Sequence, residues 1–83
     1  MPDMVKLDGK IEEGIIPAEV IVSVEDADGG IEEVPVSQVS IRDGKLLAAE
    51  IGRDQKGRVL VELPRETVSG RWRMWVKSST VGA

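Results

Sequence analysis

The stretch AEVIVSVEDADGGIEEVPV, residues 18–36, carries the clearest structural pattern in this chain of 83 residues. Apolar and polar side chains alternate over Ala18–Glu25, which puts Val20, Val22 and Val24 on one face of an extended strand. The residues DADGG at 26–30 are rich in the Asp and Gly that favour turns. The run Ile31–Val36 then predicts the second strand of a β-hairpin. Because Pro35 has no backbone N–H, we expect this second strand at a sheet edge or a bend.

The rest of the chain repeats this pattern of short alternating runs between turn residues. Of its 24 Val, Ile and Leu residues, 19 are β-branched, and no stretch of ten residues shows a helical apolar period. Asp43-Gly44 predicts a two-residue hairpin turn, with strands before and after it. Further strands are expected near residues 5–7, 58–63 and 71–77, a tight turn at Asp8-Gly9, and one helical or 3₁₀ turn over Pro64–Gly70.

These elements predict an all-β fold in a single domain spanning residues 1–83, with residues 78–83 as a flexible tail. Five or six short strands at even spacing favour a small barrel. A helical turn just before the last strand is typical of SH3-like barrels, so we expect that architecture ahead of an OB-like barrel or a small Ig-like sandwich. This expectation concerns the fold and carries no function with it.

The stretch GRWRMWV, residues 70–76, contains both tryptophans of a chain that has no Phe and no Tyr. Strand alternation puts Trp72, Met74 and Val76 on one face, and we expect Trp72 to fill the core. The opposite face forms a basic stripe with an indole in its middle: Arg71, Arg73, Trp75 and Lys77. A partly exposed Trp between cations suits a protein interface, cation–π recognition or base stacking.

Composition removes most catalytic chemistry. The chain has no Cys and no His, so it lacks disulfides, the usual zinc ligands and the usual general base. The loop Gly52–Gly57 has the glycine spacing of a phosphate-binding loop but lacks the Lys, the hydroxyl and the helix that such a loop needs. We therefore expect no enzymatic activity, no cofactor and no metal. Without a signal peptide or a long apolar run, we expect a cytoplasmic protein with no membrane association.

Charge is divided unevenly along the chain. Residues 1–40 carry ten acids and two lysines, a balance of −8, whereas residues 41–83 carry nine basic residues and five acids, a balance of +4. The sequence predicts a non-catalytic interaction module whose basic stripe contacts an acidic protein partner or another copy of the chain. One alternative is a nucleic-acid-binding small barrel, which the net charge of −4 disfavours. The other is a salt-bridge ladder within the chain, in which the stripe binds nothing.

Overall fold

The computed structural model describes residues 3–82, and its regular elements are strands and short 3₁₀ turns. In chain order the elements are β1 (Asp3–Leu7), β2 (Lys10–Glu13), β3 (Glu19–Glu25), β4 (Ile31–Ser37), η1 (Gln38–Ser40), β5 (Ile41–Arg42), β6 (Lys45–Arg53), β7 (Val59–Glu62), β8 (Arg73–Val76), η2 (Ser78–Thr80) and β9 (Val81–Gly82). Over the described residues the predicted all-β class is confirmed, as the abundance of β-branched side chains implies.

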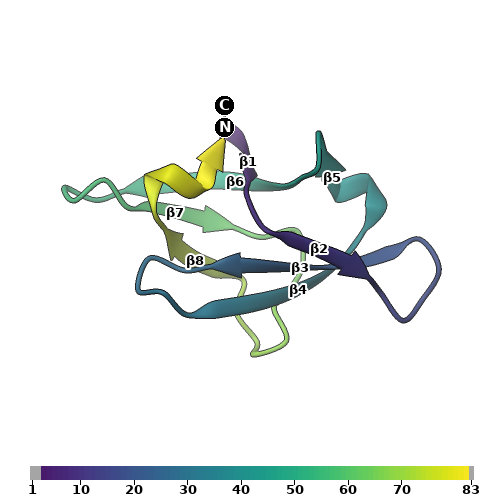
Figure 1. Ribbon diagram of the computed structural model, residues 1–83. Helices are drawn as coiled ribbons and strands as arrows, with labels where there is room; N and C mark the ends of the chain where they lie inside the picture. Colours follow the sequence, from purple (N-terminus) through teal and green to yellow (C-terminus); the bar gives the residue numbers. More distant parts are fainter. Residues whose placement is uncertain (1–2, 83) are drawn as a thin grey trace.

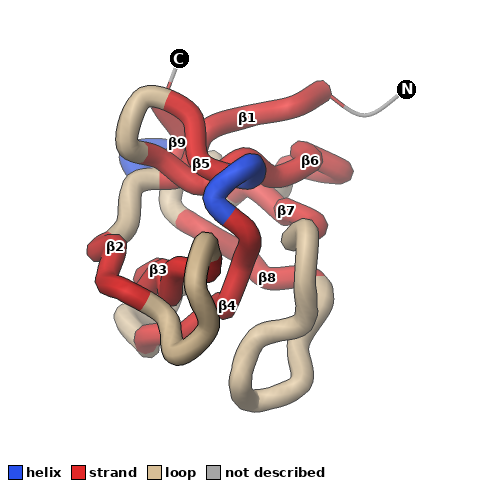
Figure 2. Tube along the Cα trace, turned by 90° about the vertical axis from the view of Figure 1, so that its right-hand side faces the viewer, coloured by secondary structure: helices blue, strands red, loops and turns tan. Residues whose placement is uncertain are grey.

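The strands form two antiparallel sheets, which do not close into the small barrel that the sequence predicts (Figure 1). The larger sheet has the order β8-β7-β6-β1-β9, with β5 pairing β6, and the smaller has the order β2-β3-β4. Figure 2 shows β2, β3 and β4 below β1 and β6. The barrel prediction is wrong because no hydrogen-bonded ladder among residues 3–82 joins the two sheets into one circuit.

The inner faces of the two sheets share one core of apolar side chains. Alternation supplies these residues, since the inward positions of every long strand are Val, Leu, Met or Ala. The buried set is Leu7, Val22, Val24, Val34, Val36, Leu46, Ala48, Val59, Val61, Leu63, Met74 and Val76. No aromatic side chain belongs to this set, so the packed layer is built from small and medium side chains.

The chain passes from the larger sheet to the smaller one at Asp8-Gly9, between β1 and β2. The space beside Gly9 is closed: an added Cβ would lie 2.7 Å from the carbonyl oxygen of Ser23 and 2.9 Å from Cγ1 of Val22. The Asp8 N–H donates to the carbonyl of Thr80 at 2.9 Å, which ties this crossing to η2. The tight turn expected at Asp8-Gly9 is therefore wrong, because the two residues link two sheets and not two paired strands.

Two local predictions are confirmed. Asp43 and Gly44 both have positive φ, 54° and 74°, and they join β5 to β6 as the Asp-Gly pair predicts. The strand that contains Pro35, β4, is an edge of the smaller sheet. The loop between β7 and β8 lies against this edge, where the Val68 N–H donates to the carbonyl of Glu33 at 2.9 Å. This contact protects an otherwise open edge.

The predicted helical turn over Pro64–Gly70 is absent. The segment forms a tight turn, in which the Gly70 N–H donates to the Thr67 carbonyl at 2.9 Å and Gly70 has a φ of 93°. The 3₁₀ turns lie elsewhere, as η1 and η2. The second of these falls in the segment 78–83 that we expected to be a flexible tail. Over its described residues this segment is instead η2 followed by β9, which pairs with β1; Ala83 lies outside them.

Trp72, expected in the core, is 53% exposed. It precedes β8, which begins at Arg73, and β8 is an edge strand of the larger sheet. The N–H of Leu63 donates to the carbonyl of Trp72 at 2.8 Å, and Leu63 itself is buried at this end of the core. The prediction of a buried Trp72 is wrong: the residue lies in a bend before β8, where strand alternation does not extend, and Leu63 is the buried residue at this end of the core.

Candidate functional site

The outward face of β8 carries the exposed part of the predicted stripe. Burial alternates along the strand, with Met74 and Val76 buried and Arg73 and Trp75 exposed. This is the alternation expected from the sequence. Trp75 is 36% exposed, so its side chain is partly covered and partly open to solvent. The predicted partial exposure of Trp75 is confirmed.

One residue of β7 and one residue of the loop before it complete the surroundings of Trp75. Leu60 is its direct cross-strand partner, and the Cζ atom of Arg58 lies over the indole, 5.5 Å from the ring centroid. That distance is within the range of a cation–π interaction. The guanidinium of Arg58 also forms an ion pair with Asp54. Arg58 is therefore held by a carboxylate on one side and an aromatic ring on the other.

Asp54 organises the loop that positions Arg58. Its side chain accepts hydrogen bonds from the backbone N–H groups of Lys56 and Arg58, at 3.0 and 2.8 Å. Partial desolvation raises the pKa of the Asp54 carboxyl, but the hydrogen bonds from the Arg58 side chain and from these two N–H groups outweigh it and leave the pKa below its ordinary value. Asp54 is thus ionised at neutral pH.

Ion pairs within the chain engage two of the predicted cations. Arg73 Nε donates to Glu62 Oε2 at 3.0 Å, and these residues are direct cross-strand partners. Arg71 lies before β8 and approaches the β3–β4 hairpin, with Asp26 Oδ2 at 4.0 Å and Glu32 Oε2 at 3.7 Å. Both acidic residues that approach Arg71 belong to the acidic first half of the chain. The expected pairing between the two halves of the chain therefore occurs at this residue.

The four predicted residues therefore do not form one stripe. Arg73 and Trp75 lie on the outward face of β8, Arg71 is drawn toward the smaller sheet, and Lys77 follows the strand at the start of η2. Lys77 is exposed and has no ion pair with residues 3–82. We define the Trp75 surface as Arg58, Leu60, Arg73, Trp75 and Lys77.

Sequence reasoning missed Arg58 and Leu60. The run 58–63 shows that Leu60 and Glu62 alternate with Val59, Val61 and Leu63, which marks their outward phase. The run does not reveal the register between β7 and β8, which sets Leu60 opposite Trp75. Only that register identifies the two residues as neighbours of the indole.

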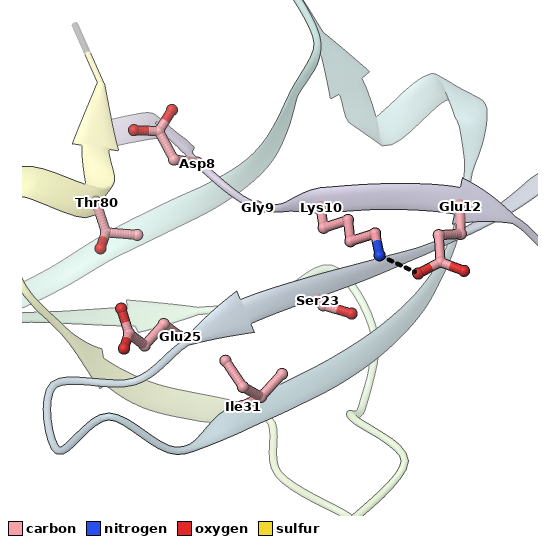
Figure 3. Close-up of a pocket in the computed structure, with 8 residues that line it drawn as sticks. All are labelled: Asp8, Gly9, Lys10, Glu12, Ser23, Glu25, Ile31 and Thr80. Carbon is pink, nitrogen blue, oxygen red and sulfur yellow. Dashed lines mark ion pairs between the residues drawn. The ribbon is translucent and has the colours of Figure 1, made fainter.

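An open cleft of about 590 Å³ lies between β2, the turn end of the β3–β4 hairpin and η2 (Figure 3). Its charged lining is mostly acidic, with Asp8, Glu12 and Glu25, and Lys10 pairs with Glu12 at 3.4 Å. Across residues 3–82 no three acidic side chains come together as metal ligands.

Searches of protein-family models, of curated proteins and of solved structures found no match to this chain. Within the described part of the chain, no helix has the length and apolarity needed to cross a membrane.

Proposed function

We propose that this domain is a non-catalytic interaction module that contacts an acidic protein partner through the Trp75 surface. The observation that carries the proposal is the exposed indole of Trp75, with Arg58 stacked over it and Arg73 beside it on the same sheet. Tryptophan and arginine are the residues most enriched among those that dominate the energy of protein interfaces.

The state of Arg58 supports the same proposal. A side chain fixed by Asp54 and by the indole loses little further conformational freedom when a partner binds. Arg73 is paired with Glu62, so its charge is largely compensated before any partner arrives. Lys77 has no such compensation from residues 3–82, and it supplies the attraction for a carboxylate.

The experiment titrates the protein with a peptide rich in Glu and Leu and follows tryptophan emission. In Trp72→Phe the only indole is Trp75, so binding should change the emission, whereas in the matched variant Trp75→Phe it should not. Lys77→Glu should weaken binding at least about tenfold, since a close like-charge contact replaces an attraction. Lys10→Glu, a charge reversal of the same size on the smaller sheet, is the control.

Single-stranded oligonucleotide is the competing ligand in the same assay. A negatively charged domain with few free cations should release an oligonucleotide by about 0.2 M salt. Oligonucleotide binding that persists at that salt, without any binding of the acidic peptide, would refute the proposal in favour of nucleic acid.

We also propose that the two sheets are an open relative of the SH3-like barrel. The support is η2, a 3₁₀ turn that directly precedes β9, the last described strand, which closes against β1. Gly82 is the partner of Lys6 in this pairing. Slow hydrogen exchange of the Gly82 amide would support the pairing, and exchange at the rate of an unprotected amide would remove the basis of the resemblance.

A further inference from the structure

The loop between β2 and β3 presents apolar side chains to solvent. Ile15 is 94% exposed and Ile16 is 61% exposed, and the neighbouring 3₁₀ turn η1 adds the exposed Val39. The N–H of Gln38 donates to the carbonyl of Ala18 at 3.0 Å, which holds η1 against this loop. We call Ile15, Ile16 and Val39 the isoleucine tip. Single exposed apolar residues are common, but three on adjoining segments indicate a contact surface.

The backbone of this loop is held in a defined shape. The Gly14 N–H donates to the Glu19 carbonyl at 2.9 Å, and the Glu19 N–H donates to the Ile16 carbonyl at 3.1 Å. Ala18 has a φ of 65°, a left-handed conformation that costs a residue with a Cβ free energy. Pro17 further limits the freedom of the chain. A loop already fixed in this way loses little entropy on docking.

The tip is flanked by negative charge. Glu12 and Glu13 end the strand that leads into it and both are exposed. Glu13 has no ion pair with residues 3–82, and Glu12 is paired only with the exposed Lys10. Apolar side chains bordered by carboxylates match a surface in which apolar side chains are bordered by cations. The Trp75 surface has that character, with Leu60 and Trp75 beside Arg58, Arg73 and Lys77.

A single molecule cannot bring the two surfaces together. The Ala27 N–H, in the β3–β4 turn, donates to the carbonyl of Trp75 at 2.8 Å, so Trp75 lies at the turn end of β3. The isoleucine tip lies at the other end of this seven-residue strand, about 20 Å away. Figure 1 shows the β2–β3 loop at the right of the molecule and β8 toward the left.

We propose that the isoleucine tip of one copy docks on the Trp75 surface of a second copy. This inference rests on the proposed function and names the acidic partner as the chain itself. The contact joins two different surfaces, so a pair of molecules keeps one free tip and one free Trp75 surface, and association continues head to tail.

The experiment uses two variants that each lose one surface. The tip variant carries Ile15→Thr and Ile16→Thr, and the surface variant carries Trp75→Thr and Lys77→Glu. Wild type should grow in mass with concentration, and each variant alone should stay at the mass of one chain. An equimolar mixture should reach about twice that mass and no more, because the one intact tip and the one intact Trp75 surface form a capped pair.

Light scattering and sedimentation measure these masses, and circular dichroism verifies that each variant is folded. If the surface variant does not fold, Lys77→Glu alone replaces it, since that side chain is exposed. Met4→Thr is the matched control, because Met4 is 63% exposed but lies on β1, outside both surfaces, and it should associate as wild type does.

Three results would overturn the inference: a wild type that stays monomeric up to about 1 mM, a tip variant that associates like wild type, or a mixture that stays at the mass of one chain. Wild type that binds phosphatidylcholine vesicles through the tip, and not a second copy, would also overturn it. If one of these results is found and wild type still binds the acidic peptide, this inference fails while the proposed function stands. If wild type does not bind the peptide either, both fail.

Discussion

Replacing Gly9 by Ala should destabilise the domain, because the chain passes between its two sheets at this residue. The new Cβ would meet the carbonyl oxygen of Ser23 at 2.7 Å and Cγ1 of Val22 at 2.9 Å. The first neighbour is a backbone atom in the middle strand of the smaller sheet, and the second belongs to a fully buried side chain. Neither can rotate away, so one of the sheets must move.

The size of the effect follows from these distances. An ordinary carbon–oxygen contact is about 3.3 Å, so the Ser23 carbonyl must retreat by about 0.6 Å. Overpacking of this kind lowers the free energy of unfolding by about 1–3 kcal/mol. Replacing Gly by Ala also lowers the entropy of the unfolded chain, which offsets up to about 1 kcal/mol of this loss. The net loss should be about 1–2 kcal/mol, which lowers Tm by roughly 5–15 °C for a domain of this size.

Urea unfolding monitored by far-UV circular dichroism measures the loss. The control is Gly52→Ala, whose Cβ would meet Leu60 only at the ordinary distance of 3.8 Å. This control should be neutral or stabilising by up to about 1 kcal/mol. Equal stability of the two variants would refute the reasoning, since it would mean that β1 and β2 do not approach β3 as closely as the structure has them.

Three further predictions concern the core and the Trp75 surface. Met74→Ala should lower the free energy of unfolding by about 2–5 kcal/mol, because Met74 is buried, whereas Trp72→Ala should lower it by less than about 1 kcal/mol. Denaturant unfolding that ranks the two variants the other way would contradict the exposure of Trp72. The lowered pKa of Asp54 contributes stability above about pH 4 that is lost as the pH falls through the folded-state pKa, so Asp54→Asn should show a shallower loss of Tm in acid than wild type. In a Trp72→Phe background, Arg58→Gln should shift the emission of Trp75, since the guanidinium no longer covers the ring, and an unchanged spectrum would argue against the stacking.

Alternation along single strands is visible in the amino-acid sequence itself. The outward and inward phases of β3 and β8 are those that the sequence predicts, including the burial of Met74 and the exposure of Trp75. The Asp43-Gly44 turn is also predictable, because its positive φ angles are a property of those two residues. These features depend on neighbours within a few positions of each other in the chain.

The Trp75 surface could be predicted only in part. Arg73 and Trp75 follow from alternation, but the position of Arg58 over the indole depends on the pairing of β7 with β8 and on the loop that Asp54 organises. The departure of Arg71 toward Asp26 depends on where the β3–β4 hairpin lies. A sequence pattern does not contain these distances.

By itself, then, the sequence determined the strand class, the phase of the long strands and the hairpin turn, because steric preference and apolar period act locally. Tertiary structure decided that the strands form two sheets, that the chain changes sheet at Gly9, and that the last described residues pair with β1. It also decided that Leu63 and not Trp72 fills the end of the core. Each of these outcomes depends on which distant segments meet, and competition between strands for partners and for interior volume is a property of the whole chain.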